Sequence, residues 1–133
     1  MAGYSGTPLP RKLGIKPDHR SLLVGAPREI ASELDIRGGN SRQESLDFVL
    51  LFVKSEADLR NNFSSLAQKL QPAGMLWVGW PKKASGVPTD LTEDVVRKVG
   101  IAAGLVDVKV CAIDETWSGL KFVYRLKDRQ KSN

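Results

Sequence analysis

The sequence contains one cysteine, Cys111, and one histidine, His19, among its 133 residues. A single cysteine excludes an internal disulfide framework and is typical of a protein that folds in a reducing compartment. A single histidine excludes a metal cluster built on several histidines. The best apolar run, residues 48–53, has the length of a strand and not the roughly 18 residues of a membrane span. We therefore expect a cytoplasmic bacterial protein with no metal site.

The first 13 residues lack the apolar centre that a secretory signal peptide requires. Length and composition predict one globular domain over residues 1–133, because 41% of the residues are hydrophobic and 26% are charged. Residues 1–12 are rich in Gly, Pro and Ser without periodicity, which predicts an extended N-terminal arm. Residues 127–133 are predicted to form a basic, solvated tail.

The net charge of +5 permits binding to phosphates or to nucleic acid but does not require it. Much of the excess lies near the two ends of the chain, where basic residues are more often solvated than engaged in binding. Three partners stay open at this point: a small anion, a protein and, more weakly, a nucleic acid. An exposed sheet edge would also allow a homodimer.

Short apolar runs alternate with amphipathic segments along the chain. Strands are predicted at residues 22–24, 46–53, 75–80, 106–111 and 120–126, and helices at 28–34, 55–70 and 90–102. Ser55 is the expected cap of the second helix, and Asp90 with Glu93 forms a capping box for the third. Residues 117–119 are the expected hairpin turn. The order predicts a three-layer α/β fold: a truncated, Rossmann-like, mostly parallel sheet of about five strands with a C-terminal antiparallel hairpin.

The core of this fold should lie between the central strand and the second helix. Leu59, Phe63, Leu66 and Leu70 fall on one stripe of that helix, and Leu50 lies within a continuous apolar strand. We expect Leu50 and Phe63 to be buried. On the third helix, Leu91, Val95, Val99 and Ala102 are the expected inward positions, with Gly104 ending the helix.

Two resemblances extend this interpretation. The segment LQPAGML, residues 70–76, resembles the turn that enters the fifth strand of class I methyltransferases, and the following helix and terminal hairpin resemble that family's last helix and strands. The segments LGIK, LLVGAP, WPKKASG, TDLTEDVV and DETWSGLKFV resemble a family of small uncharacterised bacterial proteins along nearly the whole chain. The first resemblance implies S-adenosylmethionine as a cofactor.

The first half departs from the methyltransferase pattern. That family's first strand leads into a loop of several glycines, whereas Gly25 here is followed by Ala26 and Pro27, and proline removes a backbone donor. No clear counterpart of the acid that holds the ribose hydroxyls lies within residues 28–46, which are also too few for two further strands and helices. We therefore expect no tight binding of S-adenosylmethionine.

No combination of acid, base and nucleophile emerges from the remaining residues. With Asp18 beside it, His19 could act as a general base. The commoner interpretation of such a histidine is an ordinary polar residue at the entrance of a strand. Nothing near Cys111 in the sequence lowers its pKa. We predict no catalytic residues.

The best candidate site lies at the carboxyl ends of the strands, where open α/β sheets bind their ligands. Its predicted residues are Gly25, Ser55, Lys82, Lys83, Ser85 and Gly86. The two lysines supply cations, and residues 85–86 supply a flexible backbone. The sequence predicts a non-catalytic binding module for a small anion or a macromolecular partner. The alternative is a reduced S-adenosylmethionine-dependent methyltransferase.

Overall fold

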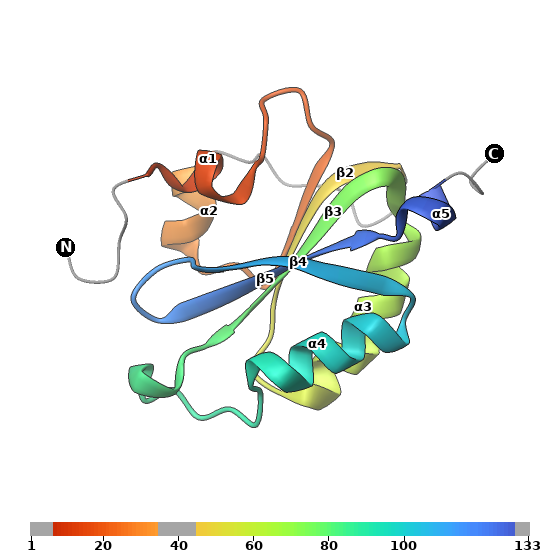
Figure 1. The fold of residues 1–133 in the computed structure, drawn as a ribbon. Coiled ribbons are helices and arrows are strands. Elements are labelled where there is room, and N and C mark those ends of the chain that lie inside the picture. Colours follow the sequence, from red (N-terminus) through yellow and green to blue (C-terminus); the bar gives the residue numbers. More distant parts are fainter. Residues whose placement is uncertain (1–6, 35–44, 130–133) are drawn as a thin grey trace.

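The computed structural model describes residues 7–34 and 45–129 (Figure 1). Its elements in chain order are α1 (Leu9–Leu13), β1 (Ser21–Val24), α2 (Arg28–Leu34), β2 (Leu46–Phe52), α3 (Glu56–Gln68), β3 (Leu70–Pro81), the 3-10 turn η1 (Lys83–Ser85), α4 (Glu93–Ala102), β4 (Leu105–Ala112), β5 (Trp117–Tyr124) and α5 (Leu126–Arg129). Within these ranges, no helix has the length and apolar character needed to cross a membrane.

The five strands form one mixed sheet in the order β1-β2-β3-β5-β4. The first three strands run parallel, joined by helical crossovers. The last strand, β5, inserts between β3 and β4 and is antiparallel to both. The predicted fold class is therefore confirmed, including the number of strands and the antiparallel hairpin at the end.

Helices cover both faces of the sheet, which gives the three predicted layers (Figure 1). On one side, here called the α1/α2 face, Phe48, Leu50 and Trp77 pack against the two N-terminal helices. On the other, the α3/α4 face, Val49 and Leu51 pack against the longer helices. Alternate residues of β2 thus enter opposite layers, and a strand buried on both faces is continuously apolar for this reason.

The helix α3 has the predicted cap and stripe, except that it ends at Gln68 and the last predicted stripe residue, Leu70, begins β3. The Ser55 hydroxyl accepts a hydrogen bond from the Asp58 backbone N–H at 3.1 Å, which caps the helix. The predicted stripe is buried at Leu59, Phe63 and Leu66, and Phe63 meets Phe122 of β5 edge to face with ring centroids 5.2 Å apart. Leu50 is fully buried as well, so both predicted core residues are confirmed.

The predicted extended arm over residues 1–12 is wrong from Leu9 onward, where α1 begins; residues 1–6 lie outside the described part of the chain. Pro10 suits the first turn of a helix, and Leu9 and Leu13 bury their side chains one turn apart. Gly14 ends the helix with a φ of 81°. The predicted tail over 127–133 is helical up to residue 129, and residues 130–133 are not described.

The predicted cap of α4 is also wrong. The Thr92 hydroxyl, not Asp90, receives the capping bond, from the Val95 N–H at 3.2 Å. The Asp90 carboxylate instead accepts from the Glu56 N–H at 2.8 Å, at the start of α3. Because the helix begins later than expected, its buried positions shift to Val96, Val99 and Gly100, while Ala102 is exposed and Val95 is half-buried.

The starts of two strands and the alternation of a third differ from the prediction. The strand β3 begins at Leu70 instead of Met75 and pairs with β2 through an irregular register. Residues 117–119 belong to β5, because the turn lies earlier, where the Asp114 carboxylate accepts the N–H groups of Thr116 and Trp117 at 2.8 Å each. A bulge after Asp107 disturbs the alternation in β4 and leaves Val108 and Val110 about half exposed, at 53% and 50%.

Candidate functional site

The carboxyl ends of β1, β2 and β3 meet at one edge of the sheet because these strands are parallel. The antiparallel strand β5 starts at the same edge, where Trp117 pairs with Pro81, the last residue of β3. Residues that are distant in the sequence therefore converge here. This is the edge at which open α/β sheets bind ligands.

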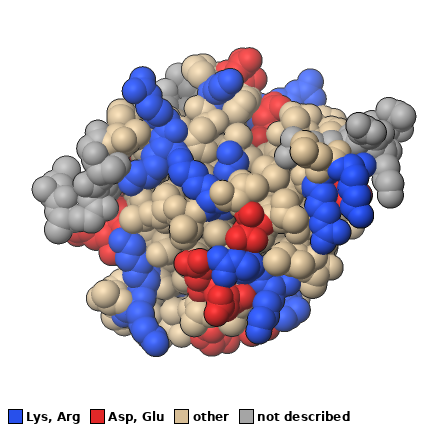
Figure 2. All heavy atoms as spheres, viewed as in Figure 1, with Lys and Arg blue, Asp and Glu red and all other residues tan. Residues whose placement is uncertain are grey.

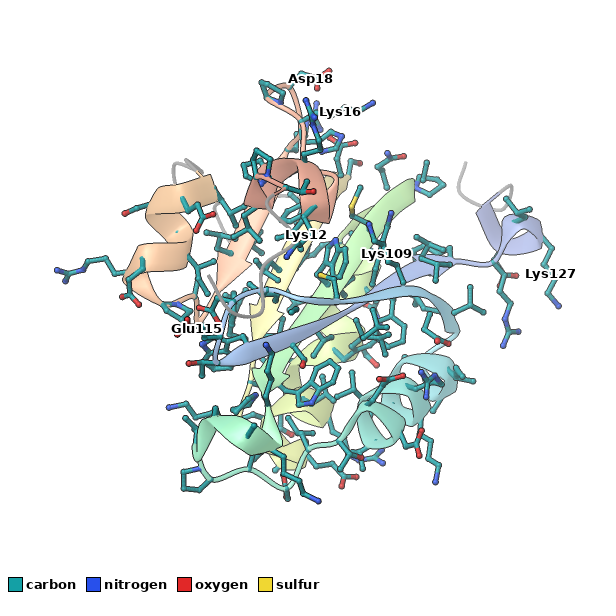
Figure 3. The ribbon with its side chains drawn as sticks, turned by 60° about the vertical axis from the view of Figure 1, so that its left-hand side comes forward. Lys12, Lys16, Asp18, Lys109, Glu115 and Lys127 are labelled. Carbon is teal, nitrogen blue, oxygen red and sulfur yellow. The ribbon has the colours of Figure 1, made fainter. Side chains whose placement is uncertain are left out.

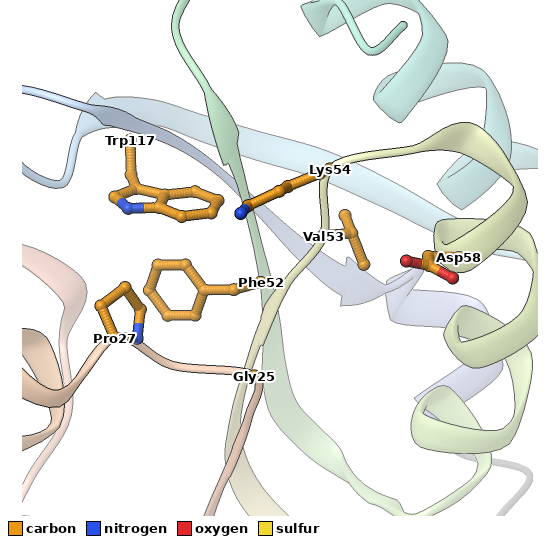
Figure 4. Close-up of a pocket in the computed structure, with 7 residues that line it drawn as sticks. All are labelled: Gly25, Pro27, Phe52, Val53, Lys54, Asp58 and Trp117. Atoms are coloured by element: carbon orange, nitrogen blue, oxygen red, sulfur yellow. The ribbon is translucent and has the colours of Figure 1, made fainter. Parts of the chain in front are cut away.

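A cavity of about 380 Å³ opens at this edge, beyond the ends of β1 and β2 (Figure 4). Seven residues line it: Gly25, Pro27, Phe52, Val53, Lys54, Asp58 and Trp117. They come from the β1–α2 turn, the end of β2, the first turn of α3 and the start of β5. The volume lies within the roughly 300–1,000 Å³ typical of small-molecule sites.

The apolar wall of the cavity consists of two aromatic rings. Phe52 and Trp117 stand edge to face, with centroids 4.9 Å apart and planes at 89°. Both side chains are more than nine-tenths buried. Pro27 lies beside the Phe52 ring (Figure 4). A rigid wall of this kind suits a flat apolar group of a ligand.

Gly25 brings the backbone of the β1–α2 turn close to β2. Its φ is 71°, a conformation that side chains with a Cβ rarely adopt. A Cβ at this position would also lie 3.0 Å from the Phe52 carbonyl oxygen. Glycine is therefore needed here to form the floor of the cavity, whatever the ligand.

Two charged side chains complete the lining. Lys54 and Asp58 are both exposed, and Figure 4 shows the Lys54 ammonium pointing toward the Trp117 ring, with Asp58 on the α3 side. The Lys54 backbone is held in place because its carbonyl accepts a hydrogen bond from the Thr89 hydroxyl at 2.6 Å. The cavity thus combines an aromatic wall with one cation and one anion at its mouth.

Of the six predicted site residues, Gly25 lines the cavity. Ser55 adjoins it, but its hydroxyl is engaged in capping α3. Lys82 leaves β3 beside the aromatic wall, and its N–H donates to the Thr116 carbonyl, one residue before Trp117, at 2.7 Å. The structure therefore brings these three residues to the same edge.

The rest of the predicted loop closes on itself. The Ser85 hydroxyl donates to the Lys82 carbonyl at 2.6 Å and accepts from the Val87 N–H at 3.2 Å. Gly86 ends η1 with a φ of 79°, and Lys83 is exposed on the turn. The Ser85 hydroxyl thus has a structural use within this loop.

The predicted set of site residues lacked six of the seven lining residues, all except Gly25. Phe52 and Val53 were assigned only to the buried strand. Trp117 was assigned to a turn, where packing against the sheet edge was favoured over an aromatic wall for a ligand. A signal for Lys54 was present, because it is the first charged residue after the apolar run of β2. Trp117 reaches the cavity only through the antiparallel insertion of β5, which residue patterns do not reveal.

The residues considered for catalysis are engaged elsewhere. The His19 Nδ1 accepts a hydrogen bond from the Lys16 N–H at 3.1 Å, within a local turn. Burial raises the pKa of the Cys111 thiol, although the nearby Lys12 and Lys109 act in the opposite direction. Across residues 7–34 and 45–129, no group of three or more His, Cys, Asp or Glu side chains is arranged to hold a metal ion.

The sheet carries only half of the doubly wound arrangement. In the Rossmann order 3-2-1-4-5-6, two strands flank the first strand on its far side, and the ligand binds where the order reverses. In the described part of this chain, β1 pairs with β2 alone and forms an edge of the sheet. The expectation that residues 28–46 hold no ribose-binding acid falls partly on residues 35–44, outside the described residues.

Solved structures with this fold include a methyltransferase and two further proteins, all three with bound S-adenosylmethionine. The magnesium protoporphyrin IX methyltransferase from Synechocystis PCC 6803, with bound SAM, matches with a TM-score of 0.51 at 15% identity over 77% of this chain and 54% of its own. Fibrillarin from Aeropyrum pernix, with natively bound S-adenosyl-L-methionine, matches with a TM-score of 0.53 at 14% identity, over 90% of this chain and 70% of its own. The LepI complex with SAM matches with a TM-score of 0.54 at 10% identity, over 88% of this chain and 39% of its own.

These likenesses establish the methyltransferase-type fold that the sequence resembled. This chain spans only about half the length of the protoporphyrin methyltransferase. No curated protein matches the sequence. The family described as "Protein of unknown function (DUF3052)" matches residues 29–126, which is most of the chain and includes the α3, β3 and hairpin segments. The chain therefore belongs to the DUF3052 family.

Proposed function

We propose that this protein is a non-catalytic binding module that holds a small anionic ligand at the carboxyl edge of its sheet. The observation that carries the proposal is the cavity itself, where the Lys54 ammonium stands over the wall formed by Phe52 and Trp117. A ligand that fits has a flat apolar portion for the wall and a carboxylate or phosphate for the ammonium. Lys82 adds positive charge at the same edge, and Lys83 follows it on the exposed turn η1.

The non-catalytic part of the proposal is supported by the state of the reactive groups. The Cys111 thiol has a raised pKa, so it carries less of the thiolate that would attack a substrate. The His19 Nδ1 and the Ser85 hydroxyl each take part in local structure. The aromatic and charged groups at the edge are suited to binding and orientation.

The alternative is a reduced S-adenosylmethionine-dependent methyltransferase. It is favoured by the position of Gly25, which turns sharply at the end of β1, where the methyltransferase fold approaches its cofactor. Pro27 supplies no backbone donor there, and β1 has no described strand on its far side. The adenosine portion would therefore lack a wall, which ranks this function second.

A thermal-shift screen tests the proposal directly, because a ligand that binds only the native state must raise the unfolding midpoint. The probes are AMP, salicylate, indole-3-acetate, inorganic phosphate, S-adenosylmethionine and S-adenosylhomocysteine. We expect at least one aromatic anion to raise the midpoint of the wild type, and Lys54→Met to abolish that rise.

Lys98→Met is the matched control, since Lys98 is an exposed lysine on α4 that does not line the cavity. It should respond like the wild type. Trp117→Leu should weaken the binding of the aromatic anions more than the binding of inorganic phosphate. If no probe stabilises the wild type, or if Lys54→Met and Lys98→Met respond alike, the proposal is wrong.

A further inference from the structure

The α1/α2 face is only partly covered by helix. The two helices pack over the β1–β3 side, through contacts of Leu9 and Ile30 with β2 and β3 residues in one cluster. Beyond the buried Trp117, the part of this face formed by β5 and β4 carries half-buried or exposed side chains, among them Lys121, Val123 and Lys109. Figure 2 shows one group of Lys and Arg side chains over α1 and the adjoining part of β4, whereas acidic and basic side chains are mixed beside α4.

Strand pairing fixes two of these lysines side by side. Lys109 of β4 and Lys121 of β5 are register partners, and Lys121 is in turn paired with Trp77 of β3. Side chains of directly paired residues point to the same face of a sheet, and like charges in this position repel each other. The pKa of Lys121 is lowered, first by burial and then by the charge of Lys109.

A third lysine reaches the same place from α1. The Lys12 ammonium donates to the Ala112 carbonyl at the end of β4, at 2.8 Å. The Lys109 ammonium lies 3.4 Å from the Lys12 carbonyl oxygen. Figure 3 shows Lys12 and Lys109 on this side of the sheet. Three lysines from α1, β4 and β5, here called the lysine triad, therefore share one patch.

The acidic residues closest along these strands are engaged elsewhere. Asp107 lies on the opposite face, where its carboxylate accepts a hydrogen bond from the Arg97 Nε at 2.9 Å. Asp114 is occupied by the hairpin turn. Within the described ranges, no ion pair is formed by Lys109 or by Lys121. An uncompensated pair of lysines costs stability, and an anion bound between them removes that cost.

We propose that the lysine triad, formed by Lys12, Lys109 and Lys121, is a binding site for a phosphate-containing anion, separate from the cavity at the carboxyl edge. The ammonium groups are compact point charges that suit phosphate oxygens. The half-buried position of Lys121 reduces the competing solvation, so its attraction to an anion exceeds that of an exposed lysine. The phosphate groups belong either to a free polyphosphate or to a nucleic-acid backbone.

The test measures binding of inorganic tripolyphosphate by calorimetry to the full chain and to three variants. Lys109→Met and Lys121→Met should each weaken binding by roughly threefold to tenfold, as expected for loss of one charged contact. Lys98→Met removes the same charge from α4 on the other face and should bind like the wild type. In the absence of anion, Lys121→Met should have an unfolding midpoint equal to or above that of the wild type, because a repulsion is lost.

A single-stranded oligonucleotide of 12 thymidines, used as a second ligand, distinguishes the two sources of phosphate. Displacement of the bound oligonucleotide by tripolyphosphate, with a steep loss of affinity in salt, identifies the nucleic-acid backbone as the occupant. Binding of tripolyphosphate without any binding of the oligonucleotide identifies a compact polyphosphate. Absence of binding for both ligands, or equal losses in Lys98→Met and Lys121→Met, would overturn the proposal. The losses caused by Lys109→Met and Lys121→Met should be of the same size in a Lys54→Met background, which separates this site from the one at the carboxyl edge.

Discussion

The α3/α4 face is covered by helices of 13 and 10 residues, whereas α1 and α2 on the opposite face have five and seven residues. The longer helices bury a continuous apolar stripe against β2, β3 and β5. The shorter ones leave the β5–β4 side of their face accessible, and the lysine triad lies there. The difference teaches that the α3/α4 face is covered more completely by helix, whereas the α1/α2 face keeps an accessible part, which is where the proposed anion site lies.

The largest expected effect lies on the α3/α4 face. Phe63→Ala removes a fully buried ring that meets Phe122, and should destabilise the protein by about 3–5 kcal/mol. Leu9→Ala on α1 should cost less, about 2 kcal/mol, since a short helix can shift to fill part of the space. Chemical denaturation of both variants measures the difference. Equal losses in the free energy of unfolding would mean that the two faces contribute equally to stability.

The close approach of α4 to the sheet predicts the next effect. A Cβ at Gly100 would lie 2.1 Å from the Phe122 ring, so Gly100→Ala forces a core side chain to move. We expect a loss of about 1–3 kcal/mol, although alanine favours helices. Ile101→Ala, at the neighbouring position that is 43% exposed, should change stability by less than about 0.5 kcal/mol. A stabilised Gly100→Ala variant would show that α4 packs more loosely than described.

On the α1/α2 face a buried hydrogen bond joins α1 to the sheet. The buried Trp77 indole N–H donates to the Leu13 carbonyl at 2.9 Å. Trp77→Phe removes this donor and leaves the carbonyl without its partner, which should cost about 1–3 kcal/mol. Hydrogen exchange should also become faster in α1 than in α3. Unchanged exchange in α1 would show that the contact does not hold this helix in place.

The smallest effect concerns Cys111, on the same face. Burial raises the pKa of this thiol, so at pH 8 it carries less thiolate than a free cysteine. Alkylation by iodoacetamide at pH 8 should be slower than for glutathione, should accelerate as the pH rises, and should reach the ordinary rate in denaturant. A rate in the native protein that equals that of glutathione would contradict the assigned environment.

Much of the fold followed from the sequence because it depends on short-range signals. The continuous apolar run of β2 and the stripe of α3 each indicate their own element, and the Ser55 cap is local in the same way. The errors occurred where a residue more distant in the sequence determines the hydrogen-bond partner or the strand boundary. Asp90 resembles a helix cap, but it binds the start of α3, and Thr92 caps α4 instead.

The candidate site was only partly predictable for the same reason. Its position at the carboxyl ends of the strands follows from the α/β order, and Gly25 follows from the sharp turn after β1. Trp117 and Phe52 meet only because β5 inserts between β3 and β4. The lysine triad likewise depends on the register of Lys109 against Lys121, and neither residue had been assigned a binding role.

The central claim is that this methyltransferase-type fold serves as a binding module without the usual cofactor. Calorimetric titration of the full chain with S-adenosylmethionine tests it most directly. We predict a dissociation constant in the millimolar range or weaker, because β1 lies at an edge of the described sheet and Pro27 supplies no backbone donor in the turn that follows it. Binding in the micromolar range would contradict this account and would make a reduced methyltransferase the better description.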